Sequence, residues 1–473
     1  MSGSNRNFGY LPPGMTHQFN PTILREYDIR GIVGDTLTEA DAYALGRTFG
    51  SQARDEGARR IAVGRDGRTH SGMLEAALVR GLIEAGIDAV LTGMGPSPML
   101  YFATYDLDVD GGIQVTGSHN PADYNGFKML LKGRSVFGAE IQALGRRSAA
   151  GEWSEGNGRT EEVHVRETYV DRLLKDFSGK GFRVGWDAGN GAAGPVLDEL
   201  VGRLPGQHYT IFTAVDGRFP NHHPDPTVEA NLGDLKRLVA DKQLDFGIAF
   251  DGDGDRIGAV DGKGRVIWGD QLLAILAEAV LKDEPGSTII ADVKASQVLF
   301  DRVAELGGKP LMWKTGHSLI KSKMKETGAP LAGEMSGHIF FKHRWYGFDD
   351  ALYAAVRLIE ALSAGGRSLT EVMDAMPKTS STPELRFQVD EARKFAIVDE
   401  VRDRLSANGA RVDATDGVRV STTDGWWLLR ASNTQDVLVA RAEAADQSGL
   451  DRLVAQVDEQ LAQSGVERVE AVH

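Results

Sequence analysis

Three aspartates stand at alternate positions in the stretch AFDGDGDRIG. Asp251, Asp253 and Asp255 follow an apolar run and are separated by glycines. Two like unit charges about 4 Å apart repel by roughly 4 kcal/mol at an effective dielectric near 20. Glycines let the backbone curl so that the carboxylates converge on one cation, and all-oxygen ligation favours Mg²⁺, with Ca²⁺ or Mn²⁺ as alternatives. The spacing predicts a metal loop with coordination positions left open for a phosphate oxygen.

A serine is displayed where a second apolar run ends. The stretch VTGSHNPADYNGFK follows the run GGIQV and carries Ser118, His119 and Lys128. Thr, Gly, Ser, Asn and Pro are ordinary turn residues, so this stretch alone predicts only a loop. It matches neither a phosphate-binding loop, because the lysine comes too late, nor a G-x-S-x-G nucleophile elbow. Beside a metal loop the serine gains a task, since a phosphoserine would supply the missing metal ligand.

The elements that position these loops alternate between strands and helices. From Arg60 the chain predicts a strand, a helix over 71–86 with Ser71 as N-cap, and a second strand, which together form a βαβ unit. The same order returns near Phe182 and near Ser287, and each second strand ends in a Gly-rich polar loop. We predict three related α/β domains with mixed sheets and a smaller C-terminal α+β domain around a central cleft.

The domain ranges follow from these repeats and from a linker, PKTSSTPEL, that precedes the last part of the chain. A length of 473 residues allows three domains at about 150 residues each, or four smaller ones. The predicted ranges are 1–18 for a loose N-terminal tail, 19–163 for domain 1 with TGSHNP, 164–264 for domain 2 with DGDGDR, 265–376 for domain 3 with GEMSGH, and 377–473 for domain 4 with RASNT.

Composition narrows the class of protein. The formal charge is -14, which argues against a nucleic-acid or membrane-surface binder and requires any anion site to be a local basic pocket. There are no cysteines, so disulfides, thiolate nucleophiles and zinc-thiolate sites are excluded. The chain start lacks the apolar core of a signal peptide, and no apolar run reaches the roughly 18 residues of a spanning helix. We expect a cytoplasmic protein.

With these loops in view, the sequence resembles the α-D-phosphohexomutases, and within them the bacterial phosphomannomutase/phosphoglucomutase group, from about Tyr27 to about Glu443. TGSHNP resembles the phosphoserine loop, DGDGDR the Mg²⁺ loop, GEMSGH the sugar-recognition loop and RASNT the phosphate-holding loop, in the family's order. The resemblance implies a four-domain isomerase of carbohydrate metabolism. It would move phosphate between O1 and O6 of mannose or glucose, with one Mg²⁺ per chain and a hexose 1,6-bisphosphate as intermediate and activator.

The resemblance also implies roles for single residues. Ser118 would carry the phosphate and, with the three aspartates, ligate Mg²⁺. Lys128 is the favoured general base, His119 would support Ser118, Arg256 would add a cation beside the metal loop, and His338 would assist from the sugar loop. The implied substrate-binding residues are Tyr27, Arg30, Lys294, Lys314, His317, Glu334, Ser336, Arg430, Ser432, Asn433 and Thr434.

Two residues in or near the phosphate-holding loop leave its role in phosphate binding open. Asp436 stands where the family commonly has Pro, and an acid so near a phosphate is unexpected. Arg441 is either a further phosphate ligand or an exposed strand arginine.

Three alternatives stay open at this point. Phosphoglucosamine mutases usually have Gln in the sugar loop where this chain has Met335. Haloacid-dehalogenase-type phosphotransferases have a strand followed by DxD, with the first Asp as nucleophile, but their usual Thr or Val is Asp255 here. A non-catalytic sugar-phosphate binding protein would not need a displayed serine beside a metal loop. Sugar phosphates are the expected partners, and a monomer is compatible with the sequence.

Overall fold

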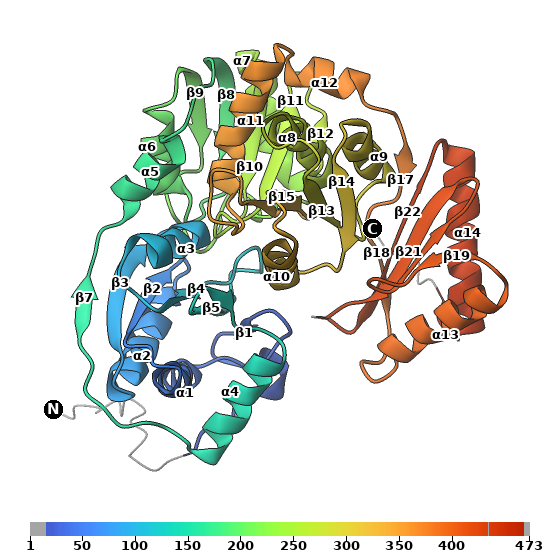
Figure 1. Cartoon of the computed structure of the whole chain (residues 1–473). Coiled ribbons are helices and arrows are strands. Elements are labelled where there is room, and N and C mark those ends of the chain that lie inside the picture. Colours follow the sequence, from blue (N-terminus) through green and yellow to red (C-terminus); the bar gives the residue numbers. More distant parts are fainter. Residues whose placement is uncertain (1–15, 434, 468–473) are drawn as a thin grey trace. The chain divides into compact units, whose positions relative to one another are not determined.

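The computed structural model describes residues 16–433 and 435–467 (Figure 1). The chain divides into two compact units, Met1–Trp268 with Ser336–Leu369, and Gly269–Met335 with Thr370–His473. Within the described residues, no helix is both long enough and apolar enough to cross a membrane.

The first unit contains a mixed sheet in the order β1-β5-β4-β2-β3-β7, with β6 paired to β5. The central strands β4, β2 and β3 run parallel, whereas β5 is antiparallel to β1 and β4. The carboxyl ends of the parallel strands therefore lie at one edge, where β4 delivers the serine loop. The strands are β1 Ile29–Ile32, β2 Arg60–Arg65, β3 Asp88–Met94, β4 Gly111–Val115, β5 Tyr124–Leu131, β6 Arg134–Ser135 and β7 Thr160–Glu162, and the helices are α1 Glu39–Asp55, α2 Ser71–Glu84, α3 Ser97–Asp106 and α4 Ala139–Ala150.

The helix predicted over 71–86 is α2, but the predicted cap is wrong. His70 takes the N-cap position and makes no side-chain cap bond. Ser71 is instead the first helical residue, and its hydroxyl donates to the carboxylate of Asp66 at 2.5 Å. The same hydroxyl oxygen accepts from the Asn125 side-chain amide at 2.8 Å, so Ser71 bonds two side chains and caps no backbone N–H of the helix.

A second sheet in the same unit positions the metal loop (Figure 1). Its order is β12-β11-β10-β8-β9, with β10 parallel to β8 and antiparallel to β11, so that 251–256 joins β10 to β11. The strands of this sheet are β8 Phe182–Asp187, β9 Gly206–Ile211, β10 Phe246–Phe250, β11 Ile257–Asp261 and β12 Val266–Ile267. The unit also contains strand β16 Ile339–Phe341, outside this sheet, and the helices α5 Arg166–Leu174, α6 Gly194–Val201, α7 Gly233–Lys242 and α11 Ala351–Gly365.

The second unit combines parallel strands with an antiparallel C-terminal sheet. Strand β13 runs parallel to both β14 and β15. In the C-terminal sheet the order is β17-β22-β21-β20-β19, β18 also pairs with β22, and every pair is antiparallel. The elements are α8 Gly269–Asp283, β13 Thr288–Asp292, α9 Gln297–Glu305, β14 Lys309–Trp313, α10 His317–Thr327, β15 Leu331–Gly333, α12 Leu369–Ala375, β17 Ser380–Ser381, β18 Leu385–Gln388, α13 Lys394–Ala407, β19 Arg411–Asp413, β20 Val418–Ser421, β21 Gly425–Ala431, β22 Val437–Ala444 and α14 Gln447–Gln463.

Adjacent tryptophans on β21 face opposite sides of the C-terminal sheet. Trp427 belongs to the core that includes residues of α13 and α14, whereas Trp426 packs with Val293 and Met312. Strand alternation thus gives the sheet two buried faces. The α/β class with mixed sheets and the C-terminal α+β part are confirmed.

Helices α1 and α2 approach closely through two glycines. A Cβ on Gly46 would overlap the carbonyl oxygen of Leu78, and one on Gly81 would overlap the carbonyl oxygen of Tyr43. Both obstacles are backbone atoms, which cannot turn aside as side chains do. The layer of helices over the first sheet therefore depends on the absence of side chains at these two positions.

We predict that Gly46→Ala lowers the free energy of unfolding by about 1–3 kcal/mol, because the added methyl forces the two helices apart. Gly72→Ala is the matched control within α2. A Cβ added at Gly72 would come no closer than 4.0 Å to Arg65 Nε, so it would meet no steric obstacle. That control should change stability by less than about 1 kcal/mol, in the stabilising direction expected of alanine in a helix. Urea unfolding measures both, and equal stabilities would contradict the close packing.

Candidate active site

The metal loop gathers three fully buried carboxylates. Asp251, Asp253 and Asp255 each have a ligand oxygen within 4.8 Å of those of the other two. The loop closes on itself because Asp251 Oδ1 accepts the N–H groups of Asp255 at 3.0 Å and Arg256 at 3.1 Å. Gly254 has a φ of 72°, in the left-handed region that favours glycine. The predicted curl of the chain is thus present.

The donor set fits a divalent cation. Oδ1 of Asp253 and Oδ1 of Asp255 are buried and accept no hydrogen bond from the described residues. Burial, reinforced by the charges of Asp253 and Asp255, raises the pKa of Asp251 well above its ordinary value. Burial acts likewise on Asp253, but the Lys128 ammonium outweighs it and lowers the pKa of that carboxyl. Buried carboxylates with unused oxygens are what a hard cation such as Mg²⁺ requires.

Ser118 lies directly against this loop. Its hydroxyl donates to Asp251 Oδ2 at 2.9 Å, and its N–H donates to the hydroxyl of Thr116 at 2.9 Å. The residue is buried and has a φ of 49°, which is uncommon for a residue other than glycine. Strand β4 ends three residues earlier, so the strained turn aims the hydroxyl from the sheet edge toward the aspartates.

His119 and Lys128 contact the same group of residues. His119 Nδ1 lies 3.2 Å from the Ser118 hydroxyl oxygen, and burial, with the charges of Arg256 and Arg30, lowers the pKa of His119 well below its ordinary value. Lys128 lies on β5, and its Nζ donates to Asp253 at 2.7 Å and to Asp255 at 2.5 Å. Burial disfavours its charge, but the two carboxylates raise the pKa of Lys128 well above its ordinary value.

Arg256 and His338 form a chain that ends on an unpredicted acid. Arg256 Nε donates to His338 Nε2 at 3.0 Å, and His338 Nδ1 lies 3.1 Å from Asp349 Oδ2 and 3.7 Å from Asp255 Oδ1. A guanidinium only donates, so Nε2 accepts and Nδ1 carries the ring proton. The geometry gives His338 the task of orienting Arg256.

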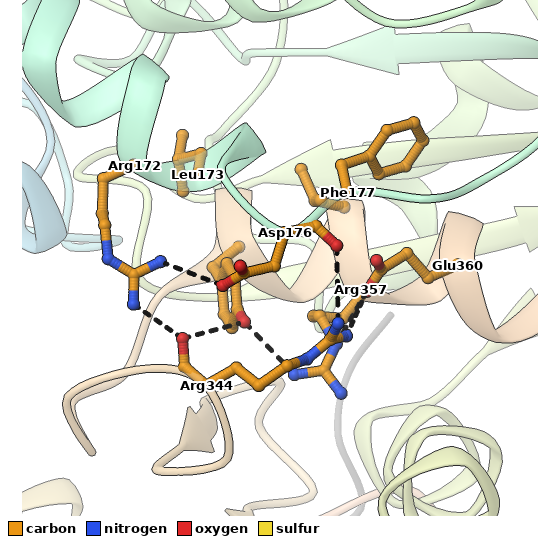
Figure 2. A pocket seen from close by; sticks show the side chains of 9 residues that line it. Arg172, Leu173, Asp176, Phe177, Arg344, Arg357 and Glu360 are labelled. Atoms are coloured by element: carbon orange, nitrogen blue, oxygen red, sulfur yellow. Dashed lines mark hydrogen bonds and ion pairs between the residues drawn. The ribbon is translucent and has the colours of Figure 1, made fainter.

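The loop that carries Asp349 is fastened by a pocket of paired charges (Figure 2). In Figure 2, Arg172 donates to the carbonyl of Arg344 at 2.7 Å, and Arg344 pairs with Glu360 at 2.6 Å. Arg357, which lines the same pocket, donates to the carbonyl of His343 at 3.1 Å. These arginines bind protein groups and hold the start of the loop at residues 343 and 344.

Arg30 reaches the serine loop from β1. Its Nη1 donates to the carbonyl of Gly117 at 3.0 Å and to Asn120 at 2.5 Å. Tyr27 lies half-buried just before β1. Among residues that the sequence did not single out, Ser97 donates to Asp253 at 2.5 Å and Thr116 donates to it at 3.2 Å.

In the second unit, one buried acid links two predicted substrate segments. Asp292 accepts the N–H of Met335 at 3.1 Å and the hydroxyl of Thr315 at 3.1 Å. Glu334 accepts the N–H of Gly316 at 2.5 Å, which ties the same two segments again. Lys294 Nζ lies 3.9 Å from Asp292. Two predicted substrate-binding residues, Lys294 and Glu334, thus lie in segments that Asp292 joins at the end of β13.

The other predicted residues of the two segments are less enclosed. Lys314 is exposed, and His317 is half-buried as the first residue of α10. Ser336 is half-buried and belongs to the first unit.

The predicted phosphate-holding loop follows β21. Arg430 donates to Asp416 at 3.0 Å, and the same carboxylate accepts the N–H of Thr315 at 3.0 Å. Ser432 accepts the N–H of Gln435 at 3.1 Å, and Asn433 is half-buried. Thr434 lies outside the described residues.

The structure shows the surroundings of Asp436 and Arg441. Asp436 is exposed, and its backbone carbonyl accepts the N–H of Val389 at 3.1 Å. Arg441 is buried, so its reading as an exposed strand arginine is wrong. It donates to the carbonyl of Lys294 and lies 3.6 Å from Asp270, and its role as a phosphate ligand stays a prediction.

Comparison with known proteins shows the relationship of the chain. Models of four phosphoglucomutase/phosphomannomutase domains match in order: alpha/beta/alpha domain I at residues 21–154, domain II at 167–264, domain III at 268–379 and the C-terminal domain at 384–460. The finer boundaries predicted above stay predictions.

Individual relatives agree with these matches. The phosphomannomutase/phosphoglucomutase of Pseudomonas aeruginosa is 46% identical over 433 residues, 91% of this chain and 94% of the relative. The phosphoglucomutase of Neisseria gonorrhoeae is 43% identical over 91% of this chain and 95% of its own. The crystal structure of a phosphoglucomutase/phosphomannomutase family protein from Burkholderia thailandensis has a TM-score of 0.90 at 43% identity, covering 95% of this chain and 98% of that one.

The buried Asp292 of the second unit should make the stability of the protein depend on pH. Burial raises the pKa of Asp292 from 3.8 to about 6, with Lys294 opposing and Glu334 adding to the shift. Between those values the folded protein keeps a proton that the unfolded chain releases. The contribution of Asp292 to the free energy of unfolding therefore falls as pH rises from about 4 to about 6, by on the order of 3 kcal/mol.

We predict that Asp292→Asn removes this fall, because asparagine does not titrate. Urea unfolding of both proteins between pH 4 and pH 7 measures the difference. Asp301→Asn, at an exposed acid of α9, serves as the matched control and should follow the wild type. Parallel pH curves for the wild type and Asp292→Asn would contradict the prediction.

Proposed function

Because this chain belongs to the phosphoglucomutase/phosphomannomutase family, we propose that it interconverts hexose 1-phosphates and hexose 6-phosphates, with glucose and mannose as the sugars. The observation that carries the proposal is the hydroxyl of Ser118, 2.9 Å from Asp251 among three buried aspartates. The family argues against two of the alternatives, the dehalogenase-type enzyme and the non-catalytic binding protein.

The proposed reaction passes phosphate through Ser118. The P–Oγ bond of phosphorylated Ser118 breaks as phosphorus bonds to the free O6 or O1 of the hexose phosphate. The sugar hydroxyl gives its proton to a base, and Oγ takes a proton, which yields a hexose 1,6-bisphosphate. After the bisphosphate turns around, the same steps run backward with its other phosphoryl group and restore phosphorylated Ser118. Such transfers depend mainly on positioning and on stabilisation of charge.

Residues of the first unit would supply the cation site and the proton transfers. Asp251, Asp253, Asp255 and a phosphate oxygen on Ser118 would hold one Mg²⁺, which supplies stabilisation of negative charge on the phosphoryl group. Lys128 is our choice for proton exchange. The two carboxylates that raise its pKa are proposed ligands of Mg²⁺, and a bound cation would offset their charge and so free Lys128 to give up its proton and act as the base. In the reverse step the same group returns the proton.

The remaining groups would hold the loop and the charge of the substrate. His119, 3.2 Å from the Ser118 hydroxyl, supports that oxygen by hydrogen bonding. Arg256, oriented by His338, brings a guanidinium to the edge of the metal loop. Arg30 lies against the serine loop, with Tyr27 just before β1.

Substrate binding is proposed to use the remaining predicted groups. Arg430, Ser432, Asn433 and Thr434 combine a guanidinium with hydroxyl and amide donors suited to the non-reacting phosphate. Lys294, Lys314 and His317 add the local positive charge that an acidic protein needs for an anionic sugar. We propose a cytoplasmic location and a monomer with sugar phosphates as its partners.

Sugar specificity follows from the need to bind in two orientations. Turning the sugar by about half a turn exchanges O1 with O6 and roughly exchanges O3 with O4. A loop that reads only O3 and O4 serves both orientations, and Glu334 and Ser336 offer an acceptor and a donor for that pair. Glucose and mannose share these hydroxyls and differ at C2, which such a loop leaves nearly unread.

We predict that Ser118→Ala lowers turnover of glucose 1-phosphate by at least about a thousandfold, roughly 4 kcal/mol, because no other group can carry the phosphate. The assay contains Mg²⁺ and a trace of glucose 1,6-bisphosphate. Ser135→Ala, on the short strand β6, is the matched control and should keep wild-type turnover. Normal turnover in Ser118→Ala would refute the carrier role.

For specificity we predict comparable kcat/KM for glucose 1-phosphate and mannose 1-phosphate and a lower value for glucosamine 1-phosphate, whose C2 ammonium has no dedicated acid. Glu334→Ala should weaken the first two substrates alike. If glucosamine 1-phosphate were best by tenfold, about 1.4 kcal/mol, the assignment would pass to phosphoglucosamine mutase. A loss confined to glucose or to mannose would show instead that the loop reads C2.

A further inference from the structure

Arg68 lies in the connection between β2 and α2, and its side chain is completely buried. Its guanidinium contacts one segment of the chain almost exclusively. Nη2 donates to the carbonyls of Ser118 at 2.8 Å and Asn120 at 2.6 Å, and Nη1 donates to the carbonyls of Tyr124 at 3.0 Å and of Pro121. Four carbonyl oxygens of the serine loop thus converge on one side chain.

Asp66, two residues earlier, holds the complementary groups of the same loop. Its Oδ2 accepts the N–H of Gly117 at 3.0 Å and the hydroxyl of Thr116 at 2.9 Å, and it lies 3.2 Å from Arg68 Nε. Asp66 thus accepts hydrogen bonds from the loop, and Arg68 donates hydrogen bonds to its carbonyls. The backbone around Ser118 is therefore fixed from both sides.

The fit between this pair and the loop leaves no room for adjustment. A Cβ on Gly117 would overlap the Arg68 guanidinium, so the loop must have glycine there to pass over it. On the other side, the Phe219 ring lies over the guanidinium, with its centroid 5.1 Å from Cζ. The Arg68 side chain has no exposed surface, its four Nη hydrogen bonds go to backbone carbonyls of the serine loop, and its Nε lies beside Asp66.

This arrangement explains how Ser118 keeps its strained conformation. A φ of 49° costs free energy for a serine and persists only where the surroundings impose it. The Ser118 carbonyl is bonded to Arg68 and its side chain to Asp251, so the residue is pulled in two directions. Without the guanidinium, four carbonyls of the loop would lose their partner, the buried carbonyl of Ser118 among them, and the loop would rotate toward other donors.

We propose that Arg68 is a positioning residue for phosphoryl transfer: it acts through the backbone of the serine loop to hold the Ser118 oxygen in line with the metal loop, and it does not touch the phosphate. The inference rests on the proposed function of Ser118 as the phosphate carrier. Asp66 completes the device by holding Thr116 and Gly117.

Lysine cannot replace this arginine. An ammonium has three donors around one nitrogen, whereas the planar guanidinium spreads five donors over the width of the loop. Arg68→Lys keeps the charge and removes the fork. It thereby separates an electrostatic contribution from the geometric one that we propose.

The test compares Arg68→Ala, Arg68→Lys and, as a matched control, Arg65→Ala. Arg65 ends β2, is half-buried and pairs with Glu75 at 3.1 Å. We expect Arg68→Ala and Arg68→Lys to lower kcat about a hundredfold, as a misplaced reacting group does, with KM within about threefold of the wild type. Guanidinium at millimolar concentration should restore Arg68→Ala at least about tenfold and leave Arg65→Ala and Ser118→Ala unchanged.

Wild-type turnover in Arg68→Lys would overturn the inference, because charge alone would then suffice. Loss of stability and activity in proportion, with no restoration by guanidinium, would overturn it as well and leave Arg68 a purely structural residue. An inactive wild type would instead refute the proposed function, so the two failures are distinguishable.

Discussion

Three carboxylates buried within 4.8 Å of one another are the constraint on which the first unit depends. Such a cluster is stable only with positive charge and donors around it. Lys128 supplies a charge to two of the aspartates, Ser97 and Ser118 supply hydroxyls, and the loop supplies its own N–H groups. Lys128 lies on β5, Ser97 begins α3 and Ser118 follows β4, so the partners come from different elements of the first unit.

The sheets make this convergence feasible. The serine loop leaves the carboxyl end of β4 and the metal loop leaves the carboxyl end of β10, where the chain turns with glycines and polar residues. Behind the serine loop, Asp66 and Arg68 lie just after the carboxyl end of β2, beside β4 in the same sheet. Strand ends thus bring together groups that are up to 156 residues apart in the chain.

Local features of the fold were predictable from the sequence, because strands, helices and polar strand ends leave short-range patterns. β2, β3, β4 and β10 were recognised in this way, as were the aspartates and Ser118. Partner choice was less accessible. The amino-acid sequence does not show that the Ser71 hydroxyl bonds Asp66 instead of capping the helix. Nor does it show that Asp349, eleven residues after His338, lies against that ring. The run RDGRTHSG after β2 was a polar strand end of the same kind as the others, and reading it as such would have pointed to Arg68.

We propose that Ser118, and not an aspartate of the metal loop, carries the phosphate. The most direct measurement is to incubate the protein with glucose 1,6-bisphosphate and Mg²⁺, digest it and map the phosphate by mass spectrometry. The account predicts one acid-stable phosphate on Ser118. A hydroxylamine-labile acyl phosphate on Asp251 would contradict it.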